Sequence, residues 1–210
     1  MKKTERHEDR RDVPPITGVV LAGGRGRRMG GLDKGLVPLH GRPIVSHVLA
    51  RLAPQVDDVL VSANRNRDRY EAFGHPVISD PDASYAGPLA GLLSALVTAK
   101  HGWVITVPCD SPALPSDLVV RLWAGLRSTG SRLAIARTGT RIHPVFCLCP
   151  TSLADDLAAF LSRGGRAFRD WIAALDCVEV PFDDVPDAFD NINTPEDLAR
   201  REGIARHPGD

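Results

Sequence analysis

The stretch ITGVVLAGGRGRRMGGLDKGL, residues 16–36, carries the clearest structural pattern in the chain. Its first part, residues 16–21, is apolar and β-branched, and a loop rich in glycine and arginine follows. This order indicates a buried strand that runs into a glycine-rich turn. Open α/β sheets bind ligands where such loops leave the carboxyl ends of strands, because glycines let backbone N–H groups approach phosphate oxygens closely. We therefore predict a strand followed by a loop that binds polyphosphate.

Two well-known phosphate-binding motifs do not fit this loop. Met29 stands where a dinucleotide-binding G-x-G-x-x-G motif has its third glycine. Lys34 lies between Asp33 and Gly35, whereas a Walker A loop needs Gly-Lys-Ser or Gly-Lys-Thr. The alternative to phosphate binding is a structural glycine turn with solvated arginines, although packing alone gives little reason for so long a basic loop.

Strand and helix patterns alternate along the first part of the chain. Apolar, β-branched runs predict strands, and apolar residues at helical spacing predict helices. The predicted strands are 16–21, 56–63, 77–79, 103–107 and 133–136, and the predicted helices are 44–52, 89–97 and 116–126. Parallel strands need helical crossovers that cover both faces of a sheet. The order therefore predicts a three-layer α/β/α, Rossmann-like fold with a mostly parallel sheet.

The second part of the chain is less regular. Its candidate elements are two strands, 144–148 and 178–181, the latter at a sheet edge, and two helices, 152–161 and 167–175. The last helix is clearer, since Thr194 can cap it and Pro195 suits its first position. We expect one domain over residues 16–203, between a flexible charged tail at 1–15 and a short tail at 204–210.

Composition and charge are those of an ordinary globular chain. The sequence has 210 residues, of which 43% are hydrophobic, with 26 basic and 26 acidic side chains and a pI of about 7.1. This balance lacks the cationic excess of a nucleic-acid-binding protein. No apolar run approaches the length of about 20 residues that crosses a membrane. The N-terminus has no signal-peptide pattern, so we expect a cytoplasmic protein.

The four cysteines and one histidine invite a chemical interpretation. Cys109, Cys147, Cys149 and Cys177 lack the paired two-residue spacing of a zinc site, so we expect reduced thiols. His143, which precedes a proline, could be a base, but a structural role is the better prediction.

Three polar residues follow predicted strands and are candidates for nucleotide or metal binding. Asp110 comes after the strand at 103–107, at the same sheet edge as the glycine-rich loop. Magnesium binds one or two carboxylates together with phosphate oxygens and water, so one aspartate is sufficient there. The alternative is a turn aspartate that caps the next helix. Asp80 could contact the nucleotide or its metal, or be a turn residue, and Asn64 could bind a base edge or ribose, or be a turn asparagine.

Seven short motifs point together to one family. They are Leu21-Ala22-Gly23-Gly24, Gly30 to Leu36, Ser62-Ala63-Asn64-Arg65, Gly87 to Gly91, Pro108-Cys109-Asp110, His143 to Phe146 and Asn191 to Asp197. As a set they resemble the molybdenum cofactor guanylyltransferases, a family of MobA-type nucleotidyltransferases, over residues 16–202. Related cytidylyltransferases usually have a second alanine in place of Gly23 and lack the Gly-x-Asp-Lys-Gly form. This difference favours guanine as the base.

The resemblance implies roles for individual residues. Lys34, Arg28 and Asp110 are implied to be catalytic, with Asp110 as the Mg²⁺ ligand. The implied GTP and magnesium contacts are Leu21, Ala22, Gly23, Gly24, Gly31, Lys34, Asn64, Asp80 and Asp110. The implied acceptor contacts are Gly87, Gly91, Arg166, Asn191 and Asn193. Alternatives stay open for this last set, because the two glycines could serve helix packing and Asn193 could shape the turn before the last helix.

The implied reaction joins GMP from GTP to the terminal phosphate of molybdopterin and releases pyrophosphate. A phosphate nucleophile is anionic at neutral pH, so positioning and charge neutralisation carry the rate without a strong general base. The expected partners are GTP, molybdopterin, and molybdopterin-handling proteins or molybdoenzyme chaperones, with no nucleic acid or membrane, and the expected state is a monomer. Two other interpretations stay open: a CTP- or UTP-dependent nucleotidyltransferase for a sugar phosphate or molybdopterin, and a non-catalytic molybdopterin carrier.

Overall fold

The fold is built on one mixed sheet. A computed structural model describes residues 12–22, 32–80 and 87–203, and within them seven strands form this sheet. In spatial order the strands are β5 (Val77–Ile78), β4 (Asp58–Ser62), β1 (Ile16–Leu21), β6 (Trp103–Pro108), β8 (Arg141–Pro150), β7 (Leu133–Thr138) and β9 (Cys177–Pro181). Strand β8 runs antiparallel to both of its neighbours, and the other pairs are parallel. The prediction of a mostly parallel sheet is confirmed, and β9 lies at its edge.

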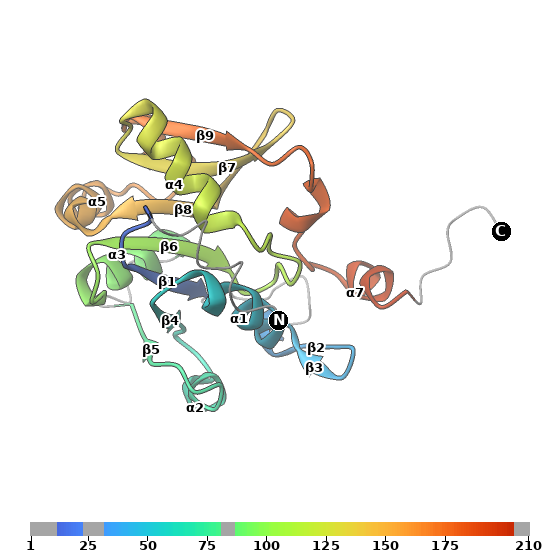
Figure 1. The fold of residues 1–210 in the computed structure, drawn as a ribbon. Helices are drawn as coiled ribbons and strands as arrows, with labels where there is room; N and C mark the ends of the chain where they lie inside the picture. Colours follow the sequence, from blue (N-terminus) through green and yellow to red (C-terminus); the bar gives the residue numbers. More distant parts are fainter. Residues whose placement is uncertain (1–11, 23–31, 81–86, 204–210) are drawn as a thin grey trace.

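Helices cover both faces of the sheet (Figure 1). Apolar side chains of α1 (Ile44–Leu52) and α4 (Leu118–Thr129) form one core with the sheet. Those of α3 (Pro88–Thr98), α5 (Ala154–Ser162) and α6 (Phe168–Ala173) form a second core. The three-layer α/β/α prediction is confirmed.

Strand β1 shows why the two cores lie on opposite faces. Successive side chains of a strand point to opposite sides of a sheet. Ile16 and Val20 belong to the first core, whereas Val19 and Leu21 belong to the second. All four are at most 8% exposed, and a mostly apolar run buried on both faces is expected of a central parallel strand.

The structure corrects several predicted boundaries. Strand β4 begins at Asp58 instead of residue 56, and β8 extends over 141–150 because it pairs with both β6 and β7. Helix α4 begins at Leu118 and continues to Thr129, where Gly130 ends it with a φ of 70°.

Two short elements have no counterpart among the predictions. One is α2 (Arg67–Glu71), and the other is the hairpin of β2 (Pro38–Leu39) and β3 (Arg42–Pro43). Positive φ values at His40 and Gly41, 48° and 75°, form the hairpin turn.

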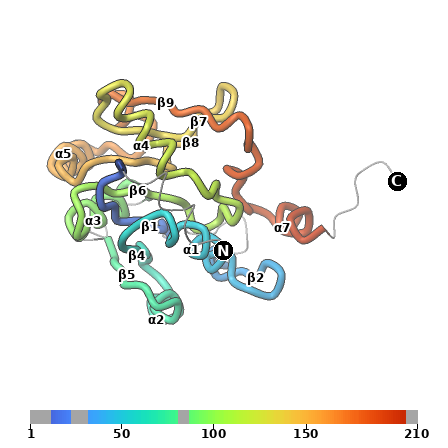
Figure 2. Tube along the Cα trace, in the orientation of Figure 1, coloured from blue at the N-terminus to red at the C-terminus, as the bar shows by residue number. Residues whose placement is uncertain are grey.

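The last helix, α7 (Pro195–Arg201), extends from the side of the molecule, as the tube in Figure 2 shows. Its capping prediction is confirmed, because the Thr194 hydroxyl accepts a hydrogen bond from the Asp197 amide at 3.1 Å and the Asp197 carboxylate accepts one from the Thr194 amide. A small apolar cluster joins the segment before α7 to the β2–β3 hairpin. Its members are Val37, Leu39, Ile44 and Ile192, with Leu198 packed against them.

The strands β1, β4 and β6 end at the same edge of the sheet, where backbone bonds join their continuations. The Ala22 amide donates to the Ser62 carbonyl at 2.8 Å, and the Cys109 amide donates to the Leu21 carbonyl at 3.1 Å. This carboxyl edge therefore brings together the residues that follow the three strands.

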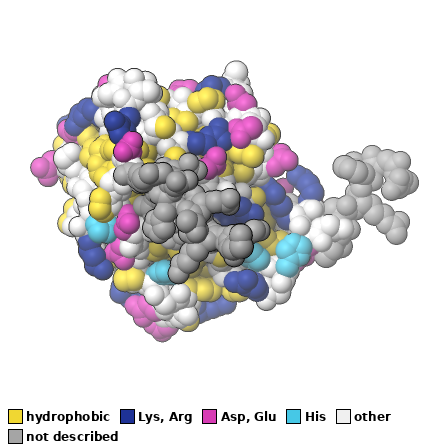
Figure 3. All heavy atoms as spheres, in the orientation of Figure 1, with side chains coloured by type: hydrophobic (Ala, Val, Ile, Leu, Met, Phe, Trp, Pro, Cys, Tyr) yellow, Lys and Arg dark blue, Asp and Glu magenta, His cyan; other side chains and the backbone are white. Residues whose placement is uncertain are grey.

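The distribution of charged side chains and the state of the cysteines are those expected from the composition. Basic and acidic side chains are interspersed over the described part of the face shown in Figure 3. The four cysteines are free thiols, as expected. Among the described residues, no helix has both the length and the apolar character needed to span a bilayer.

Candidate active site

Lys34 and Asp110 are in direct contact at the carboxyl edge. Lys34 begins the 3-10 helix η3 (Lys34–Leu36), and Asp110 follows β6. The Lys34 Nζ lies 3.2 Å from the Asp110 Oδ2, and the side chains are 23% and 10% exposed. A cation and a carboxylate from distant parts of the sequence thus share one partly buried site.

Two opposing effects act on the Asp110 carboxyl. Burial raises its pKa, the Lys34 ammonium lowers it, and burial dominates, so the pKa lies above its ordinary value. A cation that arrives beside this carboxylate would stabilise its ionised form further.

The segment before α7 completes this side of the site. Asn193 Oδ1 accepts a hydrogen bond of 2.5 Å from Lys34 Nζ. The Ile192 amide donates to the Asp110 carbonyl at 2.9 Å, and the Ser111 hydroxyl donates to Asn191 Oδ1 at 2.7 Å. Asn191 is therefore bonded to the loop that carries Asp110, and Asn193 is bonded to Lys34.

Asn64 and Asp80 form a second polar pair, after β4 and β5. Asn64 Nδ2 donates to the Asp80 carboxylate at 2.6 Å, and Asn64 Oδ1 accepts from the Asp80 amide at 2.9 Å. Burial raises the pKa of Asp80, and the bond from Asn64 opposes this increase. The two predicted residues lie together and fix each other's orientation.

The Asp33 carboxylate has two donors that no sequence motif indicates. Tyr70 Oη donates to Asp33 Oδ1 at 2.5 Å, and Asn66 Nδ2 donates to Asp33 Oδ2 at 2.9 Å. The motif that ends at Arg65 indicates a loop before α2. It does not indicate that Asn66 and Tyr70 bind Asp33, which precedes them by 33 and 37 positions. Ser111 is a similar case, since its partner Asn191 lies 80 positions along the chain.

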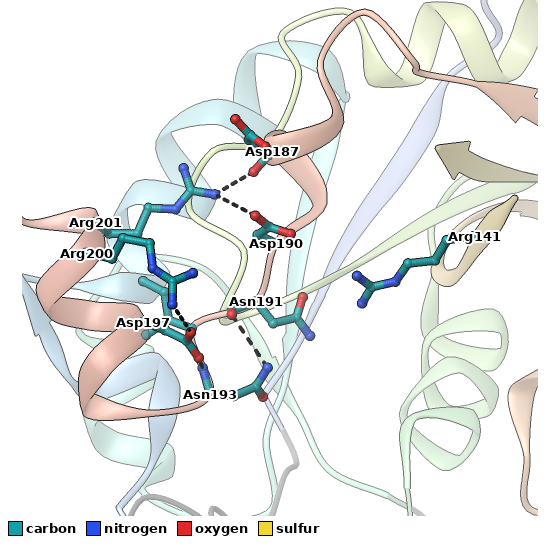
Figure 4. Close-up of a pocket in the computed structure, with 9 residues that line it drawn as sticks. Arg141, Asp187, Asp190, Asn191, Asn193, Asp197, Arg200 and Arg201 are labelled. Carbon is teal, nitrogen blue, oxygen red and sulfur yellow. Dashed lines mark hydrogen bonds and ion pairs between the residues drawn. The ribbon is translucent and has the colours of Figure 1, made fainter. Parts of the chain in front are cut away.

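A cavity of about 490 Å³ lies beside Asn193, between α7 and the beginning of β8. Figure 4 shows Arg141 reaching from β8 toward Asn191, opposite the two arginines of α7. The residues that line the cavity are Arg141, Asp187, Asp190, Asn191, Ile192, Asn193, Asp197, Arg200 and Arg201. Arg200 pairs with Asp197, and Arg201 with Asp190, while the guanidinium of Arg141 makes no hydrogen bond or ion pair with any residue that the structure describes.

Several predicted residues lie outside this group. Arg166 does not line the cavity, and its guanidinium donates to the carbonyls of Leu161 and Gly165 at 2.8 and 2.6 Å. A Cβ at Gly91 would lie 2.6 Å from the Ser62 hydroxyl, which favours the packing interpretation of this glycine. Gly87 has a φ of 113°, a backbone conformation that residues other than glycine rarely adopt.

The remaining predicted residues lie in the core, at the end of β1, or beyond the described part. His143 stacks on Phe189 with ring centroids 4.8 Å apart and shares a hydrogen bond with Thr138, so its structural interpretation is supported. Leu21 and Ala22 are buried at the end of β1. Gly23, Gly24, Arg28 and Gly31 lie outside the described residues.

A mostly parallel sheet whose carboxyl edge joins a lysine to a buried aspartate is typical of an α/β protein that binds its ligand at this edge. A sequence profile described as MobA-like NTP transferase domain matches residues 18–178. The molybdenum cofactor guanylyltransferase of Cupriavidus metallidurans is 51% identical over 196 residues, which cover 91% of this chain and 96% of that protein. The chain belongs to the molybdenum cofactor guanylyltransferase family of MobA-like NTP transferases.

Solved structures agree with this assignment. Molybdopterin-guanine dinucleotide biosynthesis protein A from Archaeoglobus fulgidus superposes with a TM-score of 0.74 at 26% identity, over 90% of this chain and 97% of that one. Rv0371C from Mycobacterium tuberculosis, solved in complex with manganese, superposes with a TM-score of 0.63 at 18% identity, over 91% and 100% of the two chains. The second likeness concerns the fold alone.

Proposed function

We propose that this protein transfers GMP from GTP to the terminal phosphate of molybdopterin and releases pyrophosphate. The observation that carries the proposal is the contact between Lys34 and Asp110, at 3.2 Å, where three parallel strands end. The names of the curated relatives support the choice of GTP and of a molybdenum cofactor as substrates.

Magnesium fits the residues present if it binds together with the nucleotide. Among the described residues, no group of three or more His, Cys, Asp or Glu could hold a metal by itself. Asp110 offers one partly buried carboxylate, and Mg²⁺ normally takes one or two carboxylates with phosphate oxygens and water. When bound, the ion would supply positive charge to the nucleotide phosphates. Asp110 would hold it.

The chain's own groups act mainly by positioning and charge. The acceptor phosphate forms a new bond to the α-phosphorus of GTP, and the bond from that phosphorus to the β-phosphate oxygen breaks, so that pyrophosphate leaves with the electron pair. Lys34, now bonded to Asp110 and Asn193, would donate to phosphate oxygens and offset their charge. Arg28 is proposed to do the same from the glycine-rich loop formed by Gly23, Gly24 and Gly31.

Asn64 and Asp80 are proposed to contact the nucleoside part of GTP. Their mutual hydrogen bonds hold the two side chains in place before a ligand arrives, which lowers the entropic cost of binding. Leu21 and Ala22, at the end of β1, are proposed to contact GTP as well.

The acceptor is proposed to bind near Asn191 and Asn193, which line the cavity next to Lys34. Gly87, Gly91 and Arg166 stay part of this proposal only through the family resemblance. The monomeric state and the association with molybdopterin-handling proteins stay predictions.

The test is pyrophosphate release from purified protein with GTP, molybdopterin and Mg²⁺. We expect release only when all three are present, and CTP and UTP should compete poorly. Release supported equally by CTP, or independent of molybdopterin, would contradict the proposal. GTP binding with no release at all would point to the carrier interpretation.

A further inference from the structure

We propose that Asp33 is a positioning residue, whose carboxylate is held by Asn66 and Tyr70 and in turn fixes Lys34 for its action on GTP. This inference deepens the proposed function and rests on it. We call Asp33, Asn66 and Tyr70 the Asp33 anchor.

Both oxygens of the Asp33 carboxylate are used in the anchor. Oδ1 accepts from Tyr70 Oη at 2.5 Å and Oδ2 accepts from Asn66 Nδ2 at 2.9 Å. No lysine, arginine or histidine in the described part of the chain forms an ion pair with this carboxylate. Two neutral donors therefore take the place of a cation, and hydrogen bonds to a charged acceptor are stronger than those between neutral groups.

The anchor acts on the turn that presents Lys34. The Asp33 carbonyl accepts from the Leu36 amide at 3.0 Å, so Asp33 is the first residue of the turn. Gly35 packs against the Tyr70 hydroxyl so closely that a Cβ there would lie 2.6 Å from it. A displacement of the Asp33 carboxylate would shift the neighbouring Lys34 backbone and so disturb the contact between Lys34 and Asp110.

Tyr70 gives the anchor a rigid reference point. Its side chain is 0% exposed and belongs to the core beneath α1 and α4. Burial raises its pKa, and the neighbouring Cys109 and Asp33 raise it further, so the phenol stays a protonated donor at every pH at which the fold is expected to persist.

Asn66 links the lysine turn to the loop that follows β4. This residue has a φ of 54°, a left-handed conformation that is uncommon outside glycine. The same loop carries Asn64, which is bonded to Asp80. The bond from Asn66 to Asp33 thus connects the proposed nucleoside contacts to the proposed phosphate contact.

The test introduces a second negative charge at the contact between Asp33 and Asn66 and then removes the first one to restore activity. N66D places two carboxylates against each other at the 2.9 Å contact, which should displace the lysine turn and lower kcat by about tenfold or more. In D33N/N66D the amide and the carboxylate exchange places, and Tyr70 keeps an acceptor. This double variant should recover to within about threefold of the wild-type kcat. E71Q is the matched control, since it alters an exposed α2 ion pair without touching the anchor, and it should leave kcat unchanged.

A second readout separates positioning from general destabilisation. The affinity for GTP is measured by calorimetry for N66D in the wild-type background and in a K34A background, below the unfolding temperature of every variant. If the anchor acts through Lys34, N66D weakens GTP binding only while Lys34 is present. An equal effect in both backgrounds, or no rescue by D33N, would overturn the proposal while the proposed function stands. If the wild type shows no molybdopterin-dependent pyrophosphate release, the proposed function fails and the anchor with it.

Discussion

Replacement of Asp110 by asparagine should separate activity from stability. The substitution keeps the shape of the side chain and removes its charge, and the backbone bond from Ile192 to the Asp110 carbonyl is unaffected. It deletes the proposed metal ligand, so we expect turnover to fall by at least about a thousandfold, the upper range for one preorganised electrostatic contact.

The free energy of unfolding should change much less. At 3.2 Å and an effective dielectric constant of about 20, the attraction between Lys34 and Asp110 is about 5 kcal/mol before desolvation. The pKa of Asp110 is nevertheless raised, which means that desolvation of the carboxylate outweighs this attraction. Lys34 keeps Asn193 as an acceptor in the variant. We therefore expect a change of less than about 2 kcal/mol at neutral pH.

The pH dependence gives a sharper measurement. Because the folded pKa of Asp110 lies above its ordinary value of 3.8, the folded state binds this proton more tightly than the unfolded state. Its contribution to the free energy of unfolding is present below pH 3.8 and is lost as the pH rises through the folded pKa. Urea unfolding of wild type and D110N across this window should show the variant gaining relative stability as the pH increases. A loss above about 3 kcal/mol at neutral pH, or near wild-type turnover, would refute the reasoning.

Three further substitutions test other parts of the structure. G91A should lower the free energy of unfolding by about 1–2 kcal/mol, because its Cβ would lie 2.6 Å from the Ser62 hydroxyl; an unchanged denaturation midpoint would show that the neighbours adjust without cost. T194A should cost about 1 kcal/mol through loss of the bond to the Asp197 amide, measured by the same unfolding method, and a neutral result would mean that the cap contributes nothing. R141A should raise the KM for molybdopterin about tenfold and leave the KM for GTP unchanged, since this side chain lines the proposed acceptor cavity; the opposite pattern would place the acceptor elsewhere.

The elements predicted best are those whose own residues determine them. Strand β1 matches its predicted bounds because an apolar run buried on both faces has a distinctive composition. Helix α2 has five residues and the β2–β3 hairpin two residues a strand, too few for a recognisable periodicity. The length of β8 depends on pairing with two neighbours, which no local pattern contains.

In the candidate site, too, some contacts could be predicted from the sequence and others depend on residues far apart in the chain. Contact between Lys34 and Asp110 could be anticipated, because parallel strands deliver their following residues to one edge. The donors to Asp33 could not, since a tyrosine inside a short helix has the pattern of an ordinary core residue. Arg166 illustrates the opposite limit, because its place in the sequence motif indicates a ligand contact, whereas its guanidinium donates to the carbonyls of Leu161 and Gly165 in its own segment.

The attachment of residues 191–193 to the Asp110 loop has a consequence for the growing polypeptide. Lys34 and Asp110 are synthesised before this segment, since Asn191 follows Ser111 by 80 residues. A nascent chain can therefore assemble the central strands while the side that we assign to the pterin is still unsynthesised. The proposed site would then become complete only after the last part of the chain has been synthesised.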